Sequence, residues 1–188
     1  MVQTPNKTIT LEEFLKLPET KPASEYVDGE IIQKPMPQGK HSRLQWKLLA
    51  KVNDLVEGKR IAEAFPELRC MFGGRAIVPD ISVFTWDRIP KDDDGEIANV
   101  FEVAPSWIIE ILSPDQSSTK VTKKILHCLD HGCWMGWLID PSDRAVIVFS
   151  PDQKPQIFDE ANQGLPVPKW VNELQLTIGE LFGWLQLS

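Results

Sequence analysis

Residues 107–112 read Trp-Ile-Ile-Glu-Ile-Leu, a short apolar run that carries one carboxylate, Glu110, near its middle. Pro105 and Pro114 bound this run, and its β-branched residues favour a strand that is covered on both faces. Burial of an ionised carboxylate without a partner costs several kcal/mol. We therefore expect Glu110 to be paired, protonated or bound to a metal ion.

The composition sets limits on the class of protein. The chain has 188 residues, of which 42% are hydrophobic and seven are Trp, so it can bury a substantial core in one domain. The net charge of −7 argues against a simple basic nucleic-acid-binding module. It is compatible with an enzyme that acts on nucleic acid, because such an enzyme needs clustered carboxylates for a metal and only a local basic surface.

The cysteines and the N-terminus indicate the compartment. Cys70, Cys128 and Cys133 are odd in number and lack the spacing of a disulfide framework, which favours a reducing cytoplasm. The first ten residues, MVQTPNKTIT, have no apolar signal core, and no segment approaches the roughly 18 apolar residues of a membrane span. We expect a cytoplasmic protein that is neither exported nor inserted in a membrane.

The N-terminal third of the sequence predicts two helices separated by a hairpin. Thr10 and Glu13 form a capping box that opens a short helix, which Pro18 closes. The dipeptide Asp28-Gly29 lies between two short apolar segments and predicts a tight turn between two strands. Residues 41–58 place apolar side chains at helical spacing, so we expect a long amphipathic helix.

The remaining segments alternate between strands and helices. A second long helix is capped by Ser113 or Ser117 and runs to about Asp130, and Thr177 with Glu180 caps a last helix. The expected strands cover residues 61–65, 67–72, 79–86, 107–113, 134–140 and 144–150.

This order predicts an α/β or α+β fold with a central mixed β-sheet flanked by helices. We expect one domain over residues 1–188, in which residues 1–24 form an N-terminal helical extension and residues 151–188 a C-terminal strand and helix extension.

Three side chains predict a cation-dependent site. Asp80 follows Pro79 at the start of a strand and Glu110 lies in the next strong strand, so adjacent strands could bring both carboxylates together. Mg²⁺ commonly takes one or two carboxylates, with waters and substrate phosphate completing its shell. Lys124 lies about two helical turns into the following helix, where a cation could orient or deprotonate a water or neutralise phosphate charge. Pro-Asp pairs are also common at ordinary strand starts.

Five segments in this order carry a resemblance to a known family. They are EYVDGEI at 25–31, HSRLQ at 41–45, VPDISVF at 78–84, IIEILSP at 108–114 and GCWMGWLIDP at 132–141, with a lysine eleven positions after Ser113. The set resembles the Uma-two type restriction endonucleases of the PD-(D/E)XK nuclease superfamily. The resemblance implies a restriction-endonuclease-like fold, dependence on Mg²⁺ (or Mn²⁺), hydrolysis of phosphodiester bonds in DNA and, by analogy, a homodimer.

The resemblance also assigns roles to residues. It makes Asp80 the motif aspartate and Glu110 the second acid, with the backbone carbonyl of Ile111 as a further metal ligand at the open edge of a sheet. Glu25 would help through a water or a second ion, or it is simply an exposed residue near the hairpin. In most of the superfamily a lysine stands two residues after the second acid, where this chain has Leu112.

In the family that the chain resembles, this lysine comes from the following helix, where this chain has Lys124. Lys124 would position the attacking water. Two further residues are candidates for substrate contact. His41, at the start of the long helix, could contact a phosphate or act as an acid–base group, although a surface position is the more ordinary interpretation. Gln45 lies one turn further on the same face. The run Asp92–Asp94 could hold a cation, but beside Gly95 it indicates a solvated turn.

Two alternatives to a nuclease site stay open. His127 and His131 are four residues apart and share a helix face, and Cys128 and Cys133 are close in sequence, which is a possible zinc pattern. The second alternative is a catalytically inactive domain that keeps the nuclease fold as a scaffold for binding a partner, because a fold does not establish a function.

Overall fold

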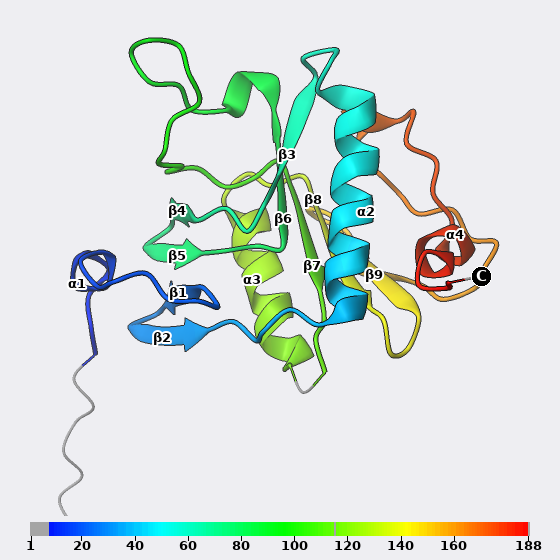
Figure 1. The fold of residues 1–188 in the computed structure, drawn as a ribbon, viewed down its shortest axis with the longest axis horizontal. Coiled ribbons are helices and arrows are strands. Elements are labelled where there is room, and N and C mark those ends of the chain that lie inside the picture. The colour runs from blue at the N-terminus through cyan, green and yellow to red at the C-terminus, as the bar shows by residue number, and fades with distance from the viewer. Residues whose placement is uncertain (1–7, 115, 188) are drawn as a thin grey trace, which may run out of the picture.

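A six-stranded mixed sheet forms the centre of the computed structural model, which describes residues 8–114 and 116–187 (Figure 1). Its strand order is β10-β9-β8-β7-β6-β3, with β7 and β8 parallel and the other neighbours antiparallel. The strands are β3 (Ala62–Pro66), β6 (Ile81–Thr85), β7 (Trp107–Ile111), β8 (Met135–Asp140), β9 (Ala145–Phe149) and β10 (Gln156–Phe158). The expected central mixed sheet is confirmed.

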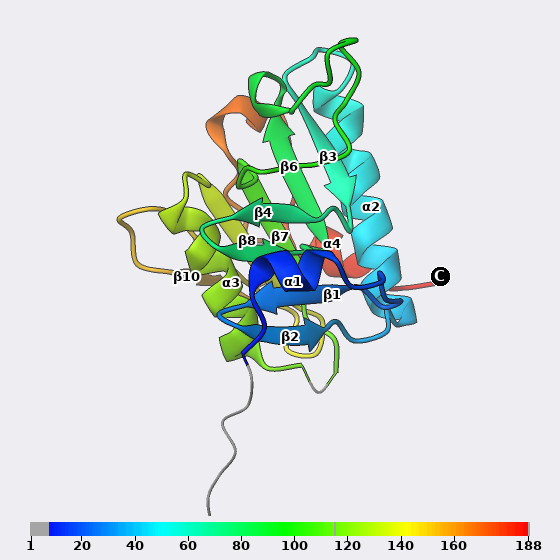
Figure 2. The same ribbon diagram turned by 90° about the vertical axis from the view of Figure 1, so that its left-hand side faces the viewer.

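A second, four-stranded antiparallel sheet lies beside the first, next to helix α3 (Figure 2). Its order is β2-β1-β5-β4, from β1 (Ser24–Val27), β2 (Glu30–Gln33), β4 (Cys70–Phe72) and β5 (Arg75–Ile77). The turn between β1 and β2 is the expected one, because Asp28 and Gly29 both have positive φ, as a type I′ turn requires. Strand β5 was not expected, because its three residues give no periodic signal.

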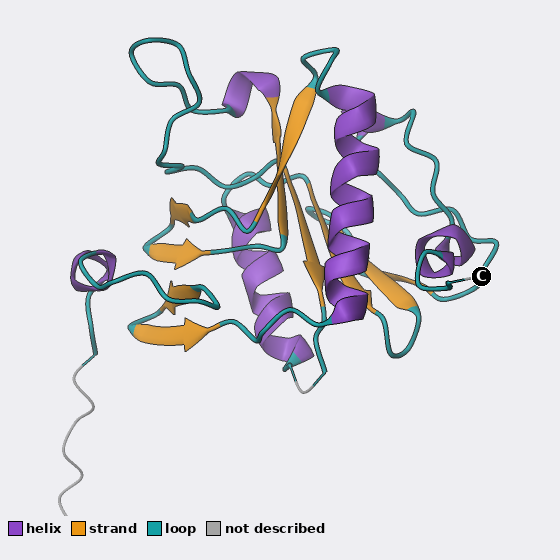
Figure 3. Ribbon diagram, in the orientation of Figure 1, coloured by secondary structure: helices purple, strands orange, loops and turns teal. Residues whose placement is uncertain are grey.

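Two long helices lie on either side of the central sheet (Figure 3). Helix α2 (Gly39–Val56) buries Leu44, Leu48, Val52 and Val56 along one face, and the expected apolar stripe is confirmed. Helix α3 (Ser118–Asp130) packs on the opposite face and is capped by Ser117, whose Oγ accepts from the Lys120 amide. The short elements are α1 (Leu11–Leu15), η1 (Trp86–Arg88), η2 (Lys169–Val171) and α4 (Ile178–Gly183).

Strand β7 connects the two apolar cores. Trp107, Ile109 and Ile111 pack on the side of α2 and the C-terminal segment, whereas Ile108 packs on the side of α3. Because side chains alternate along a strand, Glu110 also faces α3 and the small sheet. Each fully buried aliphatic side chain of this kind contributes about 1.5–3 kcal/mol relative to exposure.

Some boundaries differ from expectation. The strand expected at 67–72 forms only over Cys70–Phe72, and α2 ends at Val56, two residues before Gly58. Both capping boxes, Thr10 with Glu13 and Thr177 with Glu180, are confirmed. Residues 1–7 of the expected N-terminal extension lie outside the described residues, and the division into one domain with two extensions stays a prediction. No helix within residues 8–114 and 116–187 is long and apolar enough to span a membrane.

Gly136 in β8 sets how closely α3 approaches the sheet. A Cβ atom at this position would overlap Cγ2 of Ile125 in α3 and would lie 3.3 Å from Cγ2 of Ile108 in β7. Ile125 follows Lys124 in the sequence. The absence of a side chain at Gly136 therefore also determines how close Lys124 lies to the sheet.

We therefore expect Gly136→Ala to lower the free energy of unfolding by about 1–3 kcal/mol, because overpacking forces α3 away from the sheet. Urea denaturation measures this change. Gly39→Ala is the matched control, because a Cβ at Gly39 meets no atom within 4 Å. Equal stability of the two variants would contradict the role of Gly136.

Candidate active site

Asp80 and Glu110 lie where β6 and β7 stop pairing. The two strands are antiparallel, and their last pair is Ile81 opposite Ile109, so Asp80 and Glu110 are the next residues in that register. Glu110 still pairs with Leu138 of β8 on its other side. The expected position at the open edge of the sheet is therefore wrong, because β7 is an interior strand and Glu110 is near its end.

Asp80 is 2% exposed, and both of its oxygens have partners. Oδ2 accepts the amide N–H of Ile111 at 2.7 Å and lies 3.1 Å from Nε2 of His41, while Oδ1 accepts from Nζ of Lys34 at 2.8 Å. Burial by itself would raise the pKa of Asp80. The hydrogen bond from His41 and the charge of Lys34 outweigh burial and hold this pKa well below its usual range. Asp80 is an ionised carboxylate in the folded protein.

Lys34, which the sequence analysis missed, links Asp80 to a third carboxylate. Its ammonium group also donates to the carbonyl of Val78 at 2.8 Å and to Oε2 of Glu67 at 2.9 Å. Gln45 donates to Oε1 of Glu67 at 3.0 Å and to the carbonyl of Asp80 at 2.8 Å. Gln45 thus holds the backbone of Asp80 within an internal network.

A signal for Lys34 exists in the strand pairing. Glu25 of β1 lies opposite Ile32 of β2, and Lys34 is two residues beyond Ile32, so Lys34 continues the same face. This alternation identifies Lys34 only when the hairpin register is known and the face of Glu25 is known to be buried.

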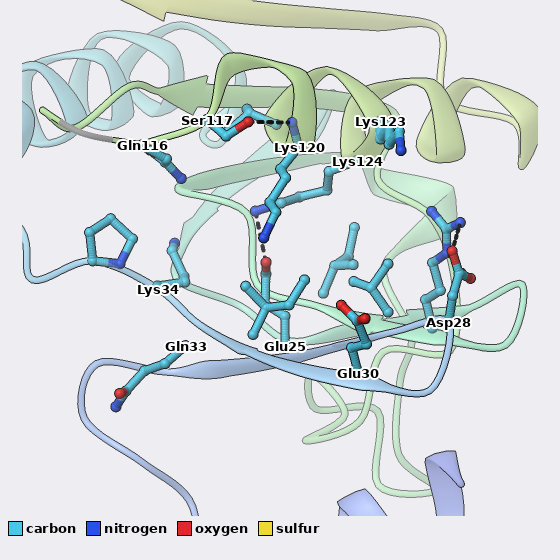
Figure 4. Close-up of a pocket in the computed structure, with 16 residues that line it drawn as sticks. Glu25, Asp28, Glu30, Gln33, Lys34, Gln116, Ser117, Lys120, Lys123 and Lys124 are labelled. Carbon is cyan, nitrogen blue, oxygen red and sulfur yellow. Dashed lines mark hydrogen bonds and ion pairs between the residues drawn. The ribbon is translucent and has the colours of Figure 1, made fainter. Parts of the chain in front are cut away.

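Lys124 joins the other two carboxylates of the cluster. Its Nζ lies 2.8 Å from Oε1 of Glu25 and 3.1 Å from Oε1 of Glu110 (Figure 4). The same oxygen of Glu25 accepts the amide N–H of Val78 at 2.8 Å. Burial would lower the pKa of Lys124, but the charges of Glu110 and Glu25 outweigh it and raise the pKa, so Lys124 stays an ammonium group.

Glu110 is the least satisfied member of this cluster. It is 1% exposed, and its Oε1 has no hydrogen-bond donor, because the contact with Lys124 brings opposite charges together without hydrogen-bond geometry. Burial raises the pKa of Glu110 to about 8; the charge of Lys124 opposes this increase, and the charge of Asp80 adds to it. Without a further cation, Glu110 holds a proton at neutral pH.

The carboxylates of the cluster outnumber its lysines by two. Glu25, Glu67, Asp80 and Glu110 carry four negative charges when ionised, and two lysines neutralise two of them. Within the described ranges, no group of three or more His, Cys, Asp or Glu side chains is arranged to hold a metal ion. Two carboxylates are nevertheless as many as Mg²⁺ commonly takes. The unpaired oxygen of Glu110 therefore fits a hard divalent cation beside Asp80.

Two cavities give access to this cluster, one on each side of Lys34. The first, of about 340 Å³, is lined by Glu25 and Lys124 and is called the Lys124 cavity below (Figure 4). The second, of about 350 Å³, is lined by His41, Asp80 and Glu67. Lys34 lines both cavities and separates them.

His41 is 5% exposed, so its expected surface position is wrong. Its ring lies against Asp80 because Gly39 begins α2 earlier than expected, which places His41 inside the first turn of the helix. The run Asp92–Asp94 is an exposed turn.

The possible zinc ligands have other partners. Nε2 of His127 lies 3.2 Å from the carbonyl of Phe72, and Nδ1 of His131 lies 2.8 Å from the carbonyl of His127. Cys128 and Cys133 are fully buried, and among residues 8–114 and 116–187 they form no group of three or more possible ligands with the two histidines that could hold a metal ion. The geometry therefore does not favour zinc at this position.

The raised pKa of Glu110 predicts a pH dependence of stability in the absence of metal. Between the ordinary value of 4.5 and about 8, the folded state binds a proton at Glu110 that the unfolded state has released. Stability therefore falls as pH rises through this window. Glu110→Gln removes this loss, so at pH 8 in EDTA we expect it to be more stable than the parent by at least about 1 kcal/mol.

Urea denaturation of both proteins at pH 5 and pH 8 measures the effect. Glu102→Gln is the control, because it removes a carboxyl group from an exposed position and should follow the profile of the parent. If Glu110→Gln and the parent lose stability in parallel between the two pH values, Glu110 is not buried as a protonated acid.

Comparison with known proteins identifies the family of the chain. A solved structure, described as "a putative nuclease belonging to DUF820" from Anabaena variabilis ATCC 29413, superposes with a TM-score of 0.94 at 61% sequence identity. The alignment covers 95% of this chain and 99% of that one. No curated protein matched the chain. The model of the Uma2 family, described as "Putative restriction endonuclease", matches residues 11–179. The chain therefore belongs to the Uma2 family of restriction-endonuclease-like proteins.

Proposed function

We propose that this protein is a metal-dependent endonuclease that hydrolyses phosphodiester bonds in DNA. The observation that carries the proposal is the buried Oε1 of Glu110, which has no hydrogen-bond donor although Glu110 lies opposite the ionised Asp80 in the continued register of β6 and β7. These two carboxylates and the backbone carbonyl of Ile111 would hold Mg²⁺ or Mn²⁺. Membership of the Uma2 family supports the assignment to the nucleases.

The bound cation would polarise the phosphate and lower the pKa of an attacking water. Lys124 would contribute positive charge beside it, because its ammonium group points at Glu110 from α3. Since Lys124 stays protonated, it would orient the water and neutralise charge that develops on the phosphate, and it would not act as the general base.

The other members of the cluster would act as positioning residues. Glu25 accepts a hydrogen bond from the Val78 amide and forms an ion pair with Lys124. It would therefore hold the ammonium group of Lys124 in place, rather than bind a second ion. His41 and Gln45 contact the side chain and the backbone of Asp80, so they would hold this ligand and not the substrate. A homodimer, the assembly expected by analogy with other restriction endonucleases, would bring two such sites together.

The competing proposal is an inactive scaffold with a nuclease fold. A scaffold has no need for a buried carboxylate that lacks a hydrogen-bond donor, because such a group lowers stability. Binding of a divalent metal separates the two proposals.

We expect Asp80→Asn and Glu110→Gln each to abolish binding of Mn²⁺ measured by calorimetry, because each removes a ligand charge. Asp80→Asn should also lower the free energy of unfolding by about 3–5 kcal/mol, because it removes the buried carboxylate that pairs with Lys34 and leaves this lysine with only the more exposed Glu67 as an anionic partner. Glu110→Gln keeps the fold and so remains informative even if Asp80→Asn fails to fold.

Glu102→Gln is the control for metal binding, because its exposed side chain lies outside both cavities. Unchanged Mn²⁺ binding in Glu110→Gln would exclude Glu110 as a ligand. Absence of Mn²⁺ binding in the parent protein would favour the scaffold.

We expect Lys124→Met to retain Mn²⁺ binding and to cleave DNA at least about a hundredfold more slowly, the usual scale for losing one charge-stabilising group. Cleavage of a single-stranded oligonucleotide and of a plasmid, each with Mn²⁺, measures the rate. Lys154→Met is the control, because Lys154 is exposed and lines neither cavity. Equal rates in the two variants would remove Lys124 from the mechanism.

A further inference from the structure

The Lys124 cavity has two walls of different origin. Side chains of the small sheet, including Glu25 and Arg75, form one wall, and the first two turns of α3 form the other (Figure 4). In the close-up, Lys120 extends from α3 into the cavity above Glu25, beside Lys124. Lys123 lines the same cavity, although one step along a helix turns a side chain by about 100°.

Cations dominate this lining, in contrast to the chain as a whole. Five of the lining side chains are cationic and three are acidic, in a protein of net charge −7; the cations are Lys34, Arg75, Lys120, Lys123 and Lys124, and the acids are Glu25, Asp28 and Glu30. Such a local concentration of positive charge attracts an anionic ligand.

Two of these five cations have no anionic partner among the residues that the structure describes. Arg75 pairs with Asp28 at 2.7 Å, and Lys34 and Lys124 pair with the carboxylates of the active site. Lys120 and Lys123 are exposed, and neither forms an ion pair with any residue in the described ranges 8–114 and 116–187. Their charge is available to an external ligand.

The start of α3 adds to the positive potential. Gln116 and Ser117, which precede the helix, line the cavity, and the first turn of α3 has no acidic residue. The N-terminus of a helix carries a partial positive charge and unpaired amide groups, both of which favour a phosphate. This end of α3 is therefore directed at the same space as Lys120.

The volume of the cavity limits what can enter. About 340 Å³ is the size of a small-molecule pocket. A double helix, whose major groove alone is about 12 Å wide, is far larger. Asp80 and Glu110 are 2% and 1% exposed, so a phosphodiester must enter a cavity to reach them. Asp80 lines the second cavity, whereas Glu110 lines neither and is adjacent to the Lys124 cavity through Lys124, whose Nζ lies 3.1 Å from its Oε1. One unpaired strand has the required dimensions.

We propose that the Lys124 cavity binds the backbone of a single nucleic-acid strand, with Lys120 and Lys123 contacting phosphates that flank the phosphodiester at Lys124. The proposal rests on the proposed function and adds the form of the substrate at the site. Lysines contact phosphates as point charges, so this part of the site holds a strand without reading its bases.

Binding of a fluorescent single-stranded oligonucleotide tests the proposal. Ca²⁺ replaces Mg²⁺ in the assay, and anisotropy is measured between 50 and 200 mM salt with the parent and with Lys120→Gln/Lys123→Gln. We expect the double variant to bind more weakly and its slope of log K against log salt to be shallower by about 1.4, or about 0.7 per lost phosphate contact on a single strand. The parent should bind a duplex of the same sequence more weakly than the single strand.

Lys154→Gln/Lys169→Gln is the matched control, because it removes two exposed lysines that line neither cavity. The control should keep the salt slope of the parent. Equal slopes in the two double variants, no binding by the parent, or a duplex bound as tightly as the single strand would each overturn the proposal.

Two further measurements separate this proposal from the proposed function. Mn²⁺ binding by Lys120→Gln/Lys123→Gln should equal that of the parent, because neither lysine contacts Asp80 or Glu110. If the parent binds the oligonucleotide through these lysines but cleaves nothing with Mn²⁺, the nuclease function fails and the cavity proposal stands. If the parent cleaves DNA and the double variant binds it with the parent's salt slope, the cavity proposal fails alone.

Discussion

The burial of Asp80 and Glu110 at the point where β6 and β7 stop pairing is the constraint on which the site depends. Two carboxylates opposite each other in the continued register of two strands in an apolar interior repel each other and lose their hydration. The protein balances only part of this cost. Asp80 has three donors and is ionised, whereas Glu110 keeps an oxygen without a donor and a raised pKa. In the proposed function, the unbalanced part of the charge would provide the affinity for a divalent cation.

The surrounding fold supplies the compensating cations from separate elements. Lys34 comes from the connection between β2 and α2, and Lys124 comes from α3, so the small sheet and the helix approach the carboxylates from different sides. Glu25 and Glu67 each accept one of these lysines. The depth of α3 depends in turn on Gly136, which allows Ile125 to contact the sheet. Packing in the core thus determines the position of a charge in the site.

Stability and function oppose each other in this arrangement. A well-satisfied core would replace Glu110 by an apolar side chain, since a buried acid without a donor destabilises the folded state. A bound cation would offset this destabilisation, because a ligand that binds only the folded state stabilises it. This would explain why the carboxylate is retained. Outside the cluster, Lys120 and Lys123 have no ion-pair partner among the described residues, and phosphates of the substrate would neutralise their charges.

The sequence by itself determined most of the elements and most of the proposed ligand set. Periodicity and capping signals predicted the long helices, the hairpin at Asp28 and the central sheet, because these features depend on neighbouring residues. Family motifs pointed to Asp80, Glu110 and Lys124. Only the tertiary structure decided that Lys34 and Glu67 join the cluster and that His41 is buried. Contacts between residues tens of positions apart depend on strand register and helix depth, which no local pattern encodes.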